Sequence, residues 1–129
     1  MVLKWRKVKL HKIYFYKDKK GNQPVLDYMH ELARKGDKSS RIKLNKIQDF
    51  IQTLGEYGTV AGEPYIKHLD GDIWELRPLR DRILFVGLVE GSYVLLHHFM
   101  KKTQKTPKRE IEQAKRELAD LMERGFGNE

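Results

Sequence analysis

Hydrophobic residues along this chain follow two different periodicities, and the change between them predicts where helices and strands lie. Residues 11–16, HKIYFY, are aromatic and β-branched, which is typical of a strand. From residue 24 the apolar positions recur every three or four residues, which indicates helices. From residue 64 they alternate with polar positions, which indicates strands. The expected order is one strand, two helices, four strands and a final helix.

The two expected helices carry recognisable start and stop signals. The first is expected to begin around Pro24, because a missing N–H is harmless in the first turn, and to end at Gly36. The second begins at Asp37 or Ser39 and ends by Gly58. So short a connection predicts an αα-hairpin. The expected apolar stripes are Val25, Met29, Leu32 and Ala33 in the first helix, and Leu44, Ile47, Phe50, Ile51 and Leu54 in the second.

The four strands that follow are expected at residues 65–69, 73–79, 82–89 and 93–100. Short turn sequences separate them, among them an Asp-Gly pair and a Glu-Gly-Ser turn. Strands joined so tightly are antiparallel neighbours, so this half of the chain predicts an antiparallel meander.

The last helix is expected to be capped by Thr106, with Pro107 in its first position and Gly125 after its end. The chain therefore predicts one α+β domain over residues 1–129. This domain contains one twisted antiparallel sheet, an N-terminal helical hairpin and a C-terminal helix. Helices are expected on one face of the sheet, with the other face partly open. The buried stripe of the last helix is expected to be Ile111, Ala114, Leu118 and Leu121.

Charge and composition narrow the class of protein. The net charge is +8, and basic residues gather at residues 1–20, where residues 1–10 form a basic N-terminal arm, and again at residues 101–109. Such clusters favour polyanionic partners. The chain has no cysteine, which excludes disulfides and thiol chemistry. We expect a cytoplasmic protein without a signal peptide or membrane contact, because no apolar run approaches the roughly 20 residues of a membrane span.

Strand alternation places two arginines on the face expected to be open. In the strand that contains Trp74 and Leu76, these two residues are the natural core positions, so Glu75 and Arg77 point the other way. Arg82 opens the next strand and is expected to share their face. Guanidinium groups at such positions can hold a phosphate and stabilise its developing charge, and a carboxylate can orient a histidine or pair with an arginine.

The last strand adds two adjacent histidines, His97 and His98, followed by Lys101 and Lys102. Alternation leaves both histidines as candidates for the open face. Histidine moves protons near neutral pH, and lysine holds phosphate. Together with the arginines, these groups fit metal-free phosphodiester cleavage, in which the RNA 2′-hydroxyl attacks its own phosphate. No metal-ligand spacing, phosphate-binding loop or GxSxG motif is present, so we expect no metal or cofactor. The residues alone indicate an anion or RNA site.

Two segments resemble a known family. WELRPLRDRILF followed by LLHHFMKKTQKTP is similar to the RelE/HigB superfamily of type II toxin–antitoxin toxins, in a phage-derived HigB-like branch. The resemblance runs from about residue 14 to residue 122 and implies a RelE-like fold. It implies a ribosome-dependent mRNA endonuclease, or mRNA interferase, that inhibits translation. It also implies a HigA-like helix-turn-helix antitoxin as partner, in a toxin–antitoxin heterotetramer.

The resemblance also assigns roles to residues. Arg82 matches the arginine that contacts the scissile phosphate, and Arg77 matches a basic position of the preceding strand. Lys102 lies near a second phosphate-binding position. His97 or His98 falls where some members place the proton-transfer group. Further candidates for binding RNA phosphates are Lys67, Lys101 and Lys105.

Two positions depart from the family pattern, and they keep other functions open. Glu75 stands where well-studied members have a lysine base, and Ile111 stands where they have a tyrosine. ParE-like toxins share the scaffold, lack nuclease activity and poison DNA gyrase, so a ParE-like activity is the first alternative. A plain basic nucleic-acid-binding module is the second.

Overall fold

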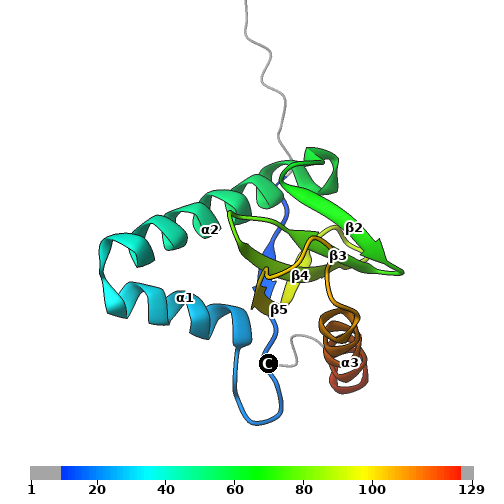
Figure 1. Ribbon diagram of the computed structural model, residues 1–129. Coiled ribbons are helices and arrows are strands. Elements are labelled where there is room, and N and C mark those ends of the chain that lie inside the picture. Colours follow the sequence, from blue (N-terminus) through cyan, green and yellow to red (C-terminus); the bar gives the residue numbers. More distant parts are fainter. Residues whose placement is uncertain (1–9, 126–129) are drawn as a thin grey trace, which may run out of the picture.

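The computed structural model describes residues 10–125, so the expected basic arm lies, apart from its last residue, outside the described residues. Three α-helices and one short 3-10 helix are present (Figure 1). The first two helices, α1 (Pro24–Lys35) and α2 (Lys38–Tyr57), are followed by the 3-10 helix η1 (Gly58–Ala61). The last helix, α3 (Lys108–Arg124), closes the described part of the chain.

Five strands form a single sheet: β1 (Ile13–Phe15), β2 (Ile66–Asp70), β3 (Ile73–Leu76), β4 (Asp81–Gly87) and β5 (Tyr93–Met100). Their order across the sheet is β1-β5-β4-β3-β2. The predicted succession of one strand, two helices, four strands and a helix is therefore confirmed, and so is the α+β class.

The sheet is mixed, so the expectation of a wholly antiparallel sheet was wrong. Strands β2 to β5 pair antiparallel with their neighbours, as the short turns required. β1 pairs parallel with β5, with Ile13 opposite Tyr93 and Phe15 opposite Leu95. β1 is joined to the other strands through α1 and α2, and so long a connection allows a strand to return in the same direction as its neighbour.

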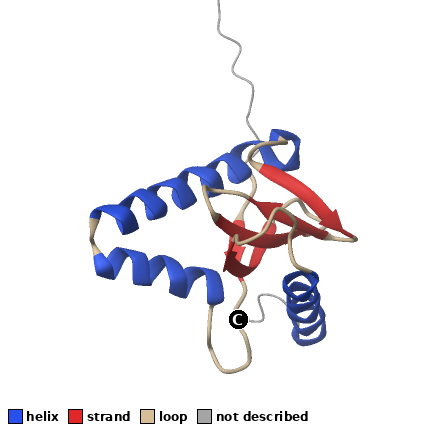
Figure 2. Ribbon diagram, in the orientation of Figure 1, coloured by secondary structure: helices blue, strands red, loops and turns tan. Residues whose placement is uncertain are grey.

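Helices cover both faces of the sheet, so the prediction of an open face was also wrong (Figure 2). We call the side covered by the first two helices the α1/α2 face. Its core includes Val25, Ile47 and Phe85. The opposite side is the α3 face, where Ala114 and Leu121 pack on strand residues that include Leu84. Helix α3 is amphipathic, and it packs its apolar stripe against the α3 face of the sheet.

Several element boundaries differ from the expected ones. β3 ends at Leu76 instead of continuing to Leu79, because the turn before β4 begins at once. Leu79 has a φ of 58°, a left-handed conformation that a regular strand cannot contain. β4 ends at Gly87, so Val89, the last residue of the strand expected at residues 82–89, lies in the following turn and is 105% exposed. Ala33 of the expected helical stripe is also exposed.

The predicted end of α1 is confirmed, whereas the predicted cap of α3 was wrong. Gly36 ends α1 with a φ of 68°, and its N–H donates to the carbonyl of Leu32, as the glycine predicts. Thr106 does not cap α3: Pro107 holds the N-cap position, and no side chain bonds there. The Thr106 hydroxyl is used elsewhere, which matters for the site below.

Candidate functional site

The α3 face carries most of the charged residues that the sequence singled out. Cross-strand pairing aligns Lys67 of β2 with Glu75 of β3, Glu75 with Leu84 of β4, and Leu84 with His97 of β5. Side chains directly opposite one another in a sheet share a face. These four residues therefore form one row across the sheet. Arg82 lies in the neighbouring row, opposite Phe99.

Glu75 and Arg82 are buried together. Glu75 is 1% exposed and Arg82 is 6% exposed. Oε1 of Glu75 lies 4.0 Å from Nε of Arg82 and 3.5 Å from Nε of Arg77. The predicted pairing of Glu75 with an arginine is therefore seen with two arginines at once. The prediction that Glu75 lies on an open face was wrong.

The Arg82 guanidinium is held in place from two sides. Its Nη1 donates to the backbone carbonyls of Leu79 and Asp81, at 2.9 and 2.8 Å. Burial lowers the pKa of Arg82 below its ordinary value, and the nearby Glu75 carboxylate opposes that shift. An arginine guanidinium keeps its proton in proteins, so the group is a cation at neutral pH. The result is a fixed, buried positive charge at the start of β4.

A basic loop, residues 101–107, lies over Arg82. Together with Arg82 and Phe99 it lines a small pocket. Thr106 Oγ1 donates to Oε2 of Glu75 at 2.6 Å, so the end of the loop is tied to the buried carboxylate. Lys101 is half-buried, while Lys102 and Lys105 are exposed. The three lysines and Arg82 are thus brought together around one pocket.

The two adjacent histidines lie on opposite faces. Leu84 pairs with His97 and Phe85 pairs with Leu95, so Leu96 is an extra residue that forms a β-bulge. Because of this bulge, Leu96 and His97 both face α3. His97 Nε2 donates to Glu110 of α3 at 2.7 Å.

His98 contacts the first helix instead. Its ring stacks on Tyr28 of α1 with 3.7 Å between the ring centroids. Its Nε2 donates to Oδ1 of Asp81 at 2.9 Å, and the Tyr28 hydroxyl donates to the same oxygen at 2.9 Å. The structure therefore separates His98 from Arg82 and the basic loop, and it leaves His97 on their side of the sheet.

The remaining candidates line the edges of the same face. Arg77 follows the end of β3, and its side chain is 24% exposed. Lys67 is exposed on β2, which is an edge strand of the sheet. The α3 face thus brings together seven of the eight predicted residues and excludes His98. These seven are Lys67, Arg77, Arg82, His97, Lys101, Lys102 and Lys105.

Two contributors were missed from the sequence. Glu110 orients His97, and Thr106 binds Glu75. Glu110 lies in the first turn of α3, where an acid is ordinarily explained by its favourable interaction with the helix N-terminus. Thr106 precedes a proline, a pattern that is typical of a helix cap. Neither pattern signals a contact with a distant strand, so no sequence signal identified them.

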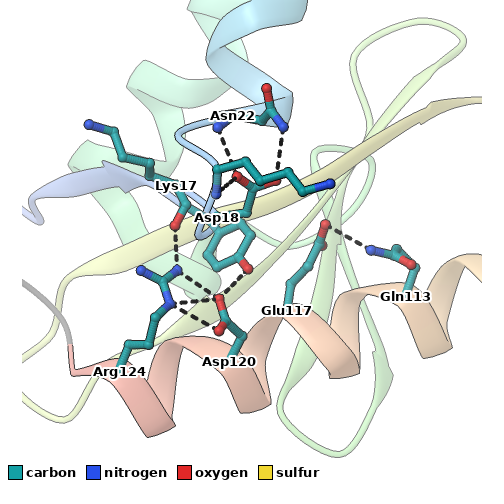
Figure 3. A network of polar contacts seen from close by, with 9 residues as sticks. Lys17, Asp18, Asn22, Gln113, Glu117, Asp120 and Arg124 are labelled. Carbon is teal, nitrogen blue, oxygen red and sulfur yellow. Dashed lines mark hydrogen bonds and ion pairs between the residues drawn. The ribbon is translucent and has the colours of Figure 1, made fainter.

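Polar contacts also anchor the C-terminal half of α3 (Figure 3). Arg124 donates to both Asp120 and the carbonyl of Lys17, and the Tyr16 hydroxyl donates to Asp120. Hydrogen bonds from Arg124 and then Tyr16 lower the pKa of Asp120 to about 2. Burial raises the pKa of Glu117, while a hydrogen bond from Gln113 opposes the shift. These bonds hold α3 against the segment after β1.

Residues 10–125 contain no group of three or more His, Cys, Asp or Glu side chains arranged to hold a metal ion. Within the same described residues, no helix is both long and apolar enough to cross a membrane.

The fold and the site together define the class of protein. It is a small α+β protein with a cationic site between the sheet and the last helix. Residues 35–119 match the family described as "Phage derived protein Gp49-like (DUF891)", and since the match covers most of the chain, the protein belongs to this family. This family is a RelE/HigB-like family associated with the toxins of toxin–antitoxin systems. No curated protein matches the chain.

Proposed function

We propose that this protein is the toxin of a type II toxin–antitoxin system and acts as an mRNA interferase. Its family association supports the toxin role. The observation that carries the nuclease activity is the presence of the buried Arg82, the basic loop and His97 on one face of the sheet. This set provides phosphate binding and proton transfer in adjacent positions.

The proposed reaction is cleavage of RNA by its own 2′-hydroxyl. The hydroxyl oxygen attacks the neighbouring phosphorus, and the bond from phosphorus to the 5′-oxygen of the next nucleotide breaks. The products are a 2′,3′-cyclic phosphate and a 5′-hydroxyl end. One proton leaves the 2′-oxygen and one is delivered to the departing 5′-oxygen, so the reaction consumes no further reactant and is proposed to be metal-independent.

Arg82 and Lys102 are the groups proposed to stabilise the charge that develops on the phosphate. Both line the pocket beneath the basic loop. A guanidinium fixed by backbone carbonyls needs little reorganisation when the charge appears, which is the basis of electrostatic catalysis. Arg77 adds a second guanidinium, 3.5 Å from Glu75. The exposed side chains of Lys67 and Lys105, with Lys101, would then follow the RNA backbone on either side.

His97 is the proposed proton-transfer group. Glu110 holds its Nε2, so the ring has a fixed orientation. Glu117 lies 4.0 Å from the Nδ1 of His97. His98 was the other candidate, and we assign it a role in holding Asp81 and α1 together.

The ribosome-bound mRNA is the proposed substrate, and a HigA-like antitoxin is the proposed partner, in a heterotetramer with two toxins and two antitoxins. In support, the positive charge of the chain favours polyanions, and the family association implies an antitoxin.

The test is induction of the protein in bacteria, with mapping of mRNA 5′ ends. Wild-type protein should arrest growth and produce new 5′ ends in translated messages. Arg82→Lys should lower cleavage about a hundredfold, because lysine keeps the charge and loses the fork of the guanidinium. Arg41→Lys is the matched control. Arg41 also donates to a backbone carbonyl, but its side chain is exposed on α2.

Two results would overturn the proposal. Growth arrest with intact mRNA and loss of DNA supercoiling would identify a ParE-like gyrase poison instead. A non-toxic protein that binds nucleic acid with a steep salt dependence would identify a basic binding module.

A further inference from the structure

Glu75 is the most deeply buried acid of the site, and both of its carboxylate oxygens are used. Oε1 faces the two guanidinium groups of Arg77 and Arg82, and Oε2 accepts the hydroxyl of Thr106. We propose that Glu75 is a positioning residue: it orients Arg82 and, through Thr106, holds the basic loop closed over it. The expected effect of Glu75 on RNA cleavage rests on the proposed function. Its expected effect on the position of the loop rests on the structure alone.

The charge of Glu75 is balanced by the two neighbouring arginines. A carboxylate that is 1% exposed is stable in the ionised form only if cations and donors replace the water it has lost. Arg77 and Arg82 are within 4.0 Å of it, so the three charges compensate one another. The same attraction prevents the two like-charged guanidinium groups from moving apart. Glu75 therefore fixes the direction in which Arg82 presents its charge.

The basic loop is attached at both of its ends. Its first residue is tied to the neighbouring turn, because the N–H of Lys101 donates to the carbonyl of Arg80 and Arg80 Nη2 donates back to the carbonyl of Lys101. Its other end is held by the hydrogen bond from Thr106 to Glu75, at 2.6 Å. A hydrogen bond to an ionised acceptor is stronger than a neutral one. Loss of this bond releases the side of the loop that borders α3.

The lysines of the loop lie between or beside these two attachments. Lys102 and Lys105 are exposed, and within residues 10–125 neither side chain forms a hydrogen bond or ion pair with the sheet. Their location relative to Arg82 is therefore set by the two ends of the loop. Glu75 thus sets the positions of the buried Arg82 and of the exposed lysines relative to one another, although it binds no phosphate itself.

The experiment uses four single variants of the full chain. Thr106→Val removes the hydroxyl and keeps the shape, while Thr106→Ser keeps the hydroxyl. Thr103→Val is the matched control, because the Thr103 hydroxyl donates within the loop, to the carbonyl of Lys105 at 2.7 Å, and does not contact Glu75. Glu75→Gln is a fourth, harsher change that tests the carboxylate itself.

The first readout does not depend on RNA cleavage. It measures hydrogen exchange of the amides of residues 101–107 and the rate at which phenylglyoxal modifies Arg82. Thr106→Val should accelerate both about tenfold, the effect of losing one hydrogen bond to a charged group, and Thr106→Ser should restore wild-type rates. Thr103→Val should leave Arg82 modification unchanged. Equal rates in Thr106→Val and wild type would overturn the proposal.

The second readout is cleavage of ribosome-bound mRNA at several substrate concentrations. Thr106→Val should raise KM about fivefold to tenfold, because Lys101 and Lys105 lose their fixed positions along the RNA backbone, and it should also lower kcat, because Lys102 loses its place beside the reacting phosphate. Glu75→Gln should lower kcat, because Arg82 loses its orientation. A uniform fall in the fraction of folded protein would instead lower activity without changing KM, and it would contradict a positioning role.

The two proposals fail in different ways. If wild-type protein cleaves no RNA, the nuclease function is wrong, and loop exchange and Arg82 modification still decide whether Glu75 holds the loop. If wild-type protein cleaves RNA and Thr106→Val matches it in both readouts, the positioning role is wrong while the nuclease function stands.

Discussion

The two faces of the sheet are built on the same strands, yet they bury different kinds of side chain. On the α1/α2 face the core is apolar, with residues such as Ile47, Leu54 and Phe85 fully buried. On the α3 face, Leu84 and Ala114 are buried beside charged groups, among them Glu75 and Arg82. Burying apolar surface stabilises a fold, whereas burying ions contributes little or is unfavourable.

The comparison separates stability from chemistry within one small domain. The α1/α2 face is expected to supply most of the stability, and the α3 face places charges where a reaction can use them. The α1/α2 face has its own polar group, formed by Tyr28, Asp81 and His98, but Asp81 is 1% exposed and sits at the end of the apolar core. The adjacent residues His97 and His98 give the sharpest test of this division.

The largest expected effect distinguishes these two histidines. His97→Gln should lower mRNA cleavage by about 10²-fold to 10⁴-fold, the usual contribution of a proton-transfer group. His98→Gln should leave cleavage near the wild-type level and lower the free energy of unfolding instead, because it disturbs the buried Asp81. Cleavage by purified protein and urea denaturation measure the two effects. The reverse outcome would place the proton-transfer group on the α1/α2 face.

Truncation of the two cores tests the expected difference in stability. Leu54→Ala should lower the free energy of unfolding by about 4 kcal/mol, because a fully buried leucine leaves a cavity among well-packed neighbours. Leu121→Ala should lower it by about 2 kcal/mol, since Leu121 is 7% exposed near the end of α3. Chemical denaturation of both variants gives the values. Equal losses would show that the two faces contribute alike.

Two carboxylates of α3 are expected to change stability with pH in opposite directions. Burial raises the pKa of Glu117 above its ordinary 4.5, so the folded protein holds that proton more tightly than the unfolded chain. Its contribution to stability is present below pH 4.5 and is lost as pH rises through the raised pKa. Glu117→Gln should therefore gain stability relative to wild type as pH increases from about 4 to about 7.

Asp120 supplies the contrasting control. Its pKa is lowered from 3.8 to about 2, so its contribution is present above 3.8 and is lost as pH falls towards 2. Asp120→Asn should remove that acid-side dependence and leave the Glu117 effect in place. Urea denaturation across the pH range measures both. Parallel curves for wild type and Glu117→Gln would show that Glu117 titrates alike in the folded and unfolded chains.

The smallest expected effect concerns the polar group on the α1/α2 face. Tyr28→Phe removes the hydroxyl that donates to Asp81, and burial raises the pKa of this tyrosine above its ordinary value. The free energy of unfolding should fall by about 1 kcal/mol, since His98 still donates to the same oxygen. Cleavage should not change. Tyr57→Phe, at an exposed position, is the control for the denaturation measurement.

Local patterns in the sequence predicted most of the fold. Pro24 and Gly36 marked both ends of α1, and alternation identified the core positions Trp74 and Leu76. These predictions succeeded because helix ends and strand faces depend on neighbouring residues. Glu75 was expected to orient a histidine or to pair with an arginine, and two arginines lie beside it.

Contacts between distant residues were the part that sequence patterns could not supply. Alternation says that Arg77 and Arg82 share a face, but it does not say that α3 covers that face. Thr106 was predicted to cap α3, but its hydroxyl binds Glu75 instead. These two residues are 31 positions apart, so no local pattern could reveal the contact. The β-bulge at Leu96 also shifts the alternation by one residue, so simple counting cannot tell which histidine faces Arg82.

The sequence by itself determined the order of elements, the relative faces within each strand and the charged residues from which a site could be built. Only the tertiary structure decided that β1 runs parallel to β5, that α3 closes the second face, and that His97 and not His98 joins Arg82. The physical reason is the range of the forces involved. Backbone sterics and periodicity act within a few residues, whereas strand pairing, helix docking and the placement of a bulge depend on the packing of segments far apart in the chain.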